Sequence, residues 1–106
     1  MRERDTAWLH LEGKDRPAVV LEVESDLVRV AYGTSEAHEW PRVEVHAETR
    51  QGRAFPLTET THFYGANTQW EQPRALRPGA KPCAWELLFA IRRVVEEYDL
   101  RVTPFD

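Results

Sequence analysis

The chain has 106 residues, which is enough for one domain around a single core. Its hydrophobic share of 42% contains no apolar run near the roughly 20 residues of a membrane span, and no secretory signal is readable, so we expect a cytoplasmic protein. The net charge of −4 argues against a broad basic surface for nucleic acid, although a local basic cleft stays possible, and the single cysteine excludes an intramolecular disulfide.

Three strand patterns follow one another in the first third of the chain. Residues 7–12 alternate, with Leu9 and Leu11 on one face. Pro17 predicts the start of a second strand that runs to about residue 23, because proline can open a strand but cannot donate a hydrogen bond from within it. A polar reversal at residues 24–26 and a third apolar run over 27–32 complete a hairpin. The predicted core face of the second strand consists of Val19, Leu21 and Val23.

The middle of the chain predicts more short strands. Residues 42–48 alternate between apolar and polar side chains, as in a sheet with one wet face. Residues 49–53 are predicted to turn the chain, and residues 54–57 and 60–64 to form two further strands. Residues 65–80 contain two prolines and two glycines and are expected to form an irregular connection.

The last element is a predicted helix at about residues 82–98, with Pro82 at its first position. Trp85 and Phe89, four residues apart, point away from its core-facing stripe and form a second apolar patch, which could pack under the preceding connection or against another chain. The predicted stripe, which docks on the sheet, consists of Ala84, Leu87, Leu88, Ile91, Val94, Val95 and Tyr98.

These patterns together predict a mainly β fold with a C-terminal helix. We expect a small, SH3-like, strongly bent antiparallel barrel of five to seven strands, closed by the helix on one face. Residues 1–106 are expected to form a single domain.

The first hairpin has a more specific likeness. An Arg-Pro pair at the start of a hydrophobic strand (RPAVVLEV, from Arg16) and a following strand that ends in Thr-Ser (VRVAYGTS, to Ser35) resemble the MazF/PemK-like toxin family of SH3-like barrels. The resemblance implies a homodimeric endoribonuclease that cuts single-stranded RNA without a metal ion or other cofactor. It also implies a cognate antitoxin protein that restrains the activity.

The resemblance assigns the catalytic roles to Arg16 and Thr34. Cleavage through the ribose 2′-hydroxyl requires an aligned attacking oxygen and fixed donors for the growing negative charge. The forked cation of Arg16 suits a phosphate, and the Thr34 hydroxyl suits the same group or the attacking hydroxyl. Neighbouring polar and aromatic residues are the expected substrate-binding groups, and they are Lys14, Ser35, His38 and Trp40.

Other interpretations of the same residues stay open. Arg16 could be a solvent-facing arginine, and Thr34 could serve only in a turn. The chain would then be a non-catalytic SH3-like module that binds a protein through these loops or through Trp85 and Phe89. The four histidines lack metal-ligand spacing, so no metal site is expected, and Cys83 is expected to pack near the helix start.

Overall fold

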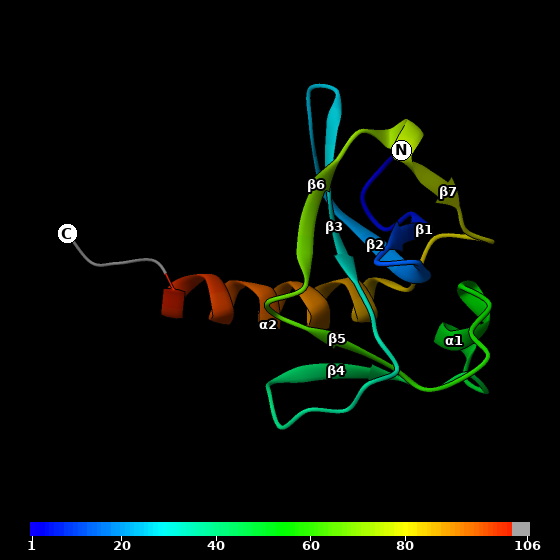
Figure 1. The fold of residues 1–106 in the computed structure, drawn as a ribbon, viewed down its shortest axis with the longest axis vertical. Coiled ribbons are helices and arrows are strands. Elements are labelled where there is room, and N and C mark those ends of the chain that lie inside the picture. Colours follow the sequence, from blue (N-terminus) through cyan, green and yellow to red (C-terminus); the bar gives the residue numbers. More distant parts are fainter. Residues whose placement is uncertain (103–106) are drawn as a thin grey trace.

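The structure is a computed structural model that describes residues 1–102. This part of the chain forms seven strands, two short helical segments and one long C-terminal helix (Figure 1). The strands are β1 (Thr6–Leu11), β2 (Lys14–Glu24), β3 (Leu27–Tyr32), β4 (Arg42–Val45), β5 (Thr61–Tyr64), β6 (Thr68–Glu71) and β7 (Leu76–Pro78). The helical segments are α1 (Arg50–Ala54), the 3-10 turn η1 (Pro73–Ala75) and α2 (Trp85–Val102).

The strands form two antiparallel sheets. The larger has five strands in the order β6-β3-β2-β1-β7, and the smaller pairs β4 with β5. A bridge between Thr34 and His62 links the chain after β3 to β5. The predicted class, a mainly β fold with a C-terminal helix, is confirmed, but within residues 1–102 the two sheets do not close into a barrel.

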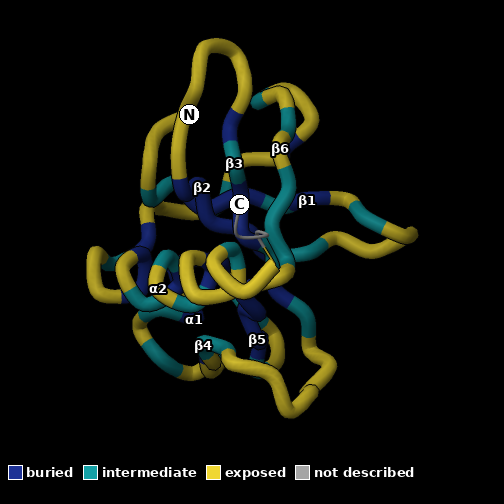
Figure 2. The backbone as a smooth tube through the Cα atoms, turned by 90° about the vertical axis from the view of Figure 1, so that its left-hand side faces the viewer, coloured by how far each residue is buried: buried dark blue, intermediate teal, exposed yellow. Residues whose placement is uncertain are grey.

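Hydrophobic side chains are buried on both faces of the five-stranded sheet, so the core is divided in two by β2. Val19 and Leu21 belong to the cluster that contains the buried residues of α2. The alternate residues Ala18 and Val20 belong to a second cluster, formed with residues of β1, β3 and β7. The prediction that Val23 belongs to the core is wrong, because Val23 is 50% exposed. It lies near the tip of the β2–β3 hairpin, which projects beyond the buried centre (Figure 2).

Helix α2 covers one face of the sheet. Four residues of its predicted stripe, Leu87, Leu88, Ile91 and Val95, are buried, whereas Tyr98 at the far end is 39% exposed. The helix begins at Trp85 and not at the predicted Pro82, because the backbone before it is tied to the N-terminal arm, where Cys83 N donates to Arg4 O (2.9 Å). Within residues 1–102 no helix is long and apolar enough to cross a membrane.

Three short segments differ from the sequence-based expectation. Residues 54–57 are not a strand, because α1 ends at Ala54 and a turn follows. The predicted turn over residues 49–53 is instead mostly the short helix α1. Thr49 caps its start, because the Thr49 Oγ1 accepts from Gly52 N (3.1 Å). The connection over 65–80 also contains β6, η1 and β7, because its short strands find partners in β3 and β1.

A close contact between β5 and α2 gives a first prediction. A Cβ at Gly65 would lie 2.3 Å from Val94 O and 2.9 Å from Tyr98 Cβ. Gly65→Ala should therefore push the strand and helix apart and lower the free energy of unfolding by about 1–3 kcal/mol in urea denaturation. The exposed neighbour provides a control, since Ala66→Ser should leave the midpoint almost unchanged. Equal midpoints for Gly65→Ala and the wild type would contradict this prediction, because they would show that α2 accommodates the added methyl group without loss of stability.

Candidate functional site

The two predicted catalytic residues come together where β2 begins and β3 ends, at one end of these paired inner strands. Arg16 lies near the start of β2, and Thr34 follows β3, its paired neighbour. Gly33 N donates to Pro17 O (2.8 Å), which holds the two segments side by side. Thr34 is fixed further by two backbone hydrogen bonds with His62, Thr34 N to His62 O (3.0 Å) and His62 N to Thr34 O (2.7 Å).

Arg16 and Thr34 line two neighbouring concavities, the first of which we term the polar hollow. It has a volume of about 270 Å³. Two cations, Lys14 and Arg16, face three carboxylates in its lining, so it has no excess of positive charge. The carboxylates belong to Asp15, Glu36 and Glu59, and the remaining lining includes Trp8, Ser35, Leu57, Thr58 and Thr61.

The second concavity, which we term the aromatic hollow, has a volume of about 180 Å³. The rings of His38 and Trp40 stack with centroids 4.4 Å apart, and Tyr64 meets Trp40 edge-on at 5.4 Å. Tyr64 also supports the loop, because its hydroxyl donates to Glu36 O (2.8 Å) and accepts from His38 N (2.5 Å). The rest of the lining consists of Leu11, Glu12, Arg16, Tyr32, Thr34, Glu36 and Asn67.

Arg16 has an unusual environment for a strand arginine. Its side chain is only 18% exposed, and its Nε is buried without a hydrogen-bond partner among the described residues. The one ion pair it forms there is weak, with 4.0 Å between Nη2 and Oε2 of the largely exposed Glu12. A buried donor without an acceptor is costly, so an oxygen-rich group that enters either hollow would be stabilised by Arg16.

The Thr34 hydroxyl is held by the local turn. Its Oγ1 accepts from Glu36 N (3.2 Å), which leaves the hydroxyl proton free to donate to a ligand. His38 Nε2 lies 3.5 Å from Glu36 Oε2, so a carboxylate accompanies the imidazole in the same loop.

The structure places all six predicted site residues around these two hollows. Lys14 and Ser35 line the polar hollow, His38 and Trp40 line the aromatic hollow, and Arg16 and Thr34 line both. Two carboxylates of these hollows, Glu36 and Glu59, were not predicted as site residues, and the aromatic hollow also includes Asn67 and Tyr64. For Tyr64 the local sequence carries no signal for this role, because the pairing of Thr34 with His62 is what brings β5 to the site.

The predicted patch of Trp85 and Phe89 lies apart from the hollows. These side chains are 48% and 57% exposed, and neither lines the polar or the aromatic hollow. Their ring centroids are 5.7 Å apart, and the Arg4 guanidinium lies 4.3 Å above the Trp85 ring. No cluster of three His, Cys, Asp or Glu side chains in residues 1–102 is placed to hold a metal ion.

The carboxylate at the mouth of the polar hollow gives a second prediction. The hydrogen bond from His10, with Arg77 nearby, holds the pKa of Asp15 below its ordinary value. A depressed pKa means that Asp15 stabilises the fold above its ordinary pKa and that this contribution is lost as the pH falls through the lowered value. His10→Ala should therefore raise the pKa of Asp15 in an NMR titration. Glu44, whose pKa is lowered mainly by its hydrogen bond with Arg42 and not by His10, serves as the reference carboxylate and should titrate identically in both proteins.

Cys83 gives a third prediction. The residue is fully buried, and burial raises the pKa of its thiol from 9.0 to about 11. It should not react with a thiol reagent at pH 8 until the protein unfolds, and stability should decline as the pH rises from 9 toward 11 because only the unfolded thiol ionises there. Reaction of the native protein as fast as urea-unfolded protein would contradict this placement.

A comparison with protein-family models and with curated protein sequences finds no match to this chain.

Proposed function

We propose that this protein is a MazF/PemK-like endoribonuclease toxin that cleaves single-stranded RNA in the cytoplasm without a metal ion. One observation carries the proposal. The partly buried Arg16, whose Nε has no hydrogen-bond partner among residues 1–102, lines both the polar and the aromatic hollow together with Thr34. This arrangement suits a phosphate with one nucleotide on either side.

The aromatic hollow accounts for the choice of a single strand. Proteins bind unpaired RNA by stacking its bases on aromatic side chains and holding its phosphates with cations. The stacked rings of His38 and Trp40 offer such a surface within the same hollow as Arg16. A duplex keeps its bases stacked on one another, so it could not use this surface.

The reaction in this proposal is an internal transesterification. The ribose 2′-oxygen attacks phosphorus, the bond to the 5′-oxygen of the next nucleotide breaks, and a 2′,3′-cyclic phosphate remains. Arg16 stabilises the negative charge on the phosphoryl oxygens, and the Thr34 hydroxyl donates to one of them. The 2′-hydroxyl loses a proton and the leaving oxygen gains one, and His38, in the loop beside Thr34, is the candidate for this exchange.

The proposal includes the partners that the family likeness implies. A second copy of the chain would cover the exposed patch of Trp85 and Phe89, giving a homodimer. A cognate antitoxin protein would block access to Arg16.

RNA cleavage tests the proposal directly. Purified protein incubated with mixed-sequence RNA in EDTA should yield fragments that end in a cyclic phosphate. Thr34→Val, which replaces the hydroxyl by a methyl group of similar size, should slow cleavage about 10- to 100-fold. Thr60→Val, which alters a threonine outside both hollows, is the matched control and should cleave at nearly the wild-type rate. Intact RNA with the wild-type protein would defeat the proposal.

A second function is favoured by the charge of the polar hollow. Three carboxylates outnumber two cations there, which suits a basic segment of a protein better than a chain of phosphates. The fold would then be a non-catalytic interaction module. Binding of a basic peptide that is lost on Glu59→Gln, together with intact RNA, would establish this function instead.

A further inference from the structure

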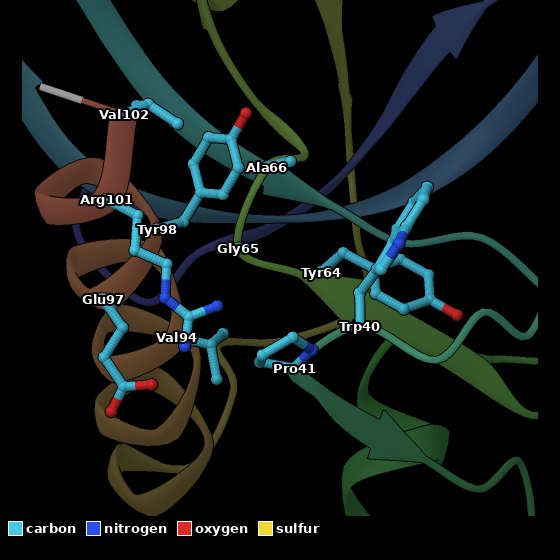
Figure 3. Close-up of a pocket in the computed structure, with 10 residues that line it drawn as sticks. All are labelled: Trp40, Pro41, Tyr64, Gly65, Ala66, Val94, Glu97, Tyr98, Arg101 and Val102. Carbon is cyan, nitrogen blue, oxygen red and sulfur yellow. The ribbon is translucent and has the colours of Figure 1, made fainter.

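A third concavity lies on the other side of Trp40, between the second half of α2 and the segments that flank β4 and β5 (Figure 3). We term it the α2 pocket. Its volume is about 410 Å³, within the range of sites that bind small molecules. Its side chains come mainly from Trp40, Pro41, Tyr64, Val94, Tyr98 and Arg101.

The walls of the α2 pocket are apolar and partly open to solvent. Trp40 is 56% exposed and Tyr98 is 39% exposed, so two large rings face an unfilled space. In Figure 3 these rings lie on opposite sides of the backbone at Gly65. A flat apolar group that enters the pocket and packs against either ring would bury aromatic surface that is now in contact with water.

The α2 pocket has one positively charged lining residue, Arg101. Arg101 and Glu97 are its charged lining residues, and Glu97 is already paired with Arg93, with 3.7 Å between Oε1 and Nε. Within the described part of the chain Arg101 forms no ion pair. The free guanidinium therefore favours an anionic partner, and a carboxylate matches its forked donors.

We infer that the α2 pocket binds an aromatic carboxylate, with the ring against the apolar lining of Trp40, Val94 and Tyr98 and the carboxylate on Arg101. This chemistry has two sources, a free aromatic acid or the C-terminal aromatic residue of a peptide. The α2 pocket shares Trp40 and Tyr64 with the aromatic hollow, whereas Val94, Tyr98 and Arg101 line neither hollow. Binding at these three residues can therefore be tested independently of RNA cleavage.

A titration followed by NMR tests the inference. Isotope-labelled full-length protein is titrated with 3-phenylpropionate and, separately, with the uncharged 3-phenylpropanol. The acid should give saturable shifts at the Trp40 indole and the Val94 and Tyr98 amides, with an affinity at least about tenfold higher than that of the alcohol. N-acetyl-alanyl-phenylalanine forms the peptide arm, and tighter binding than that of the free acid identifies a peptide terminus as the natural source.

Variants assign the charge contact. Arg101→Gln should lower the affinity for 3-phenylpropionate about tenfold, whereas Arg74→Gln, an exposed arginine on η1, should leave it unchanged. No shift at roughly 10 mM acid, equal affinities for acid and alcohol, or no effect of Arg101→Gln would each overturn the inference. Phe105 lies outside the described residues. If the Phe105→Ala variant binds 3-phenylpropionate more tightly than the wild type does, the inference is also overturned, because the chain itself would then supply the occupant of the pocket.

Discussion

Replacement of Arg16 by lysine should slow RNA cleavage about 100- to 1,000-fold although the positive charge is kept. Lysine presents a single ammonium group in place of a planar fork, so it cannot hold two phosphoryl oxygens at once. It also lacks the Nε donor, which in the wild-type protein is buried without a hydrogen-bond partner among residues 1–102. The loss should appear mainly in kcat, because the interaction strengthens as charge develops on the phosphoryl group.

The same variant should fold as well as the wild type. Within residues 1–102 the Arg16 Nε makes no hydrogen bond, and the ion pair of Arg16 with Glu12 is long. Loss of the guanidinium should therefore change the free energy of unfolding by less than about 1 kcal/mol. A matched control is Arg74→Lys on η1, which should alter neither cleavage nor stability. If Arg16→Lys cleaves RNA within about threefold of the wild-type rate, the forked contact has no part in catalysis.

The elements that could be predicted from the sequence are those with a local pattern. The β2–β3 hairpin shows two apolar runs around a polar reversal, and the buried stripe of α2 repeats at helical spacing. Even there the pattern misled at Val23, because alternation does not show where a strand leaves the core.

The elements that escaped prediction depend on distant partners or on a cap. Strand β6 has four residues and is stabilised by its pairing with β3 about 40 positions away, which no window of sequence contains. Helix α1 has five residues, and the Thr49 cap that fixes it also fits a simple turn. A segment of four or five residues has too few positions for the spacing of its apolar side chains to distinguish a strand from a helix.

The candidate site shows the same division. Arg16 and Thr34 could be predicted as neighbours, because each lies at an end of one hairpin. The aromatic surface beside them could not, since it depends on the hydroxyl of Tyr64 holding the backbone at Glu36 and His38. That contact joins the loop after β3 to a residue of β5 more than 20 positions away.

Phe63→Ala should have the largest effect on stability of any change considered. Phe63 is fully buried in the cluster beneath α2, and its ring lies 5.8 Å from that of Phe55 between centroids. Deletion of a buried phenyl ring leaves a cavity and should lower the free energy of unfolding by about 3–5 kcal/mol. Domains of this size have about 5–15 kcal/mol in total, so the variant should be close to unfolding in urea denaturation followed by circular dichroism.

The position of Phe63 also connects this core to the candidate site. A Cβ at Gly33 would lie 3.2 Å from the Phe63 ring, so this ring supports the backbone that leads to Thr34. Trp70→Ala is the matched control, because this aromatic residue also lies on a four-residue strand but is 41% exposed, and its loss should cost less than about 1 kcal/mol. Equal destabilisation by the two variants would mean that the ring of Phe63 is not packed as the structure shows. Phe63→Leu, which refills most of the space, should recover more than half of the lost stability and leave the backbone at Thr34 supported.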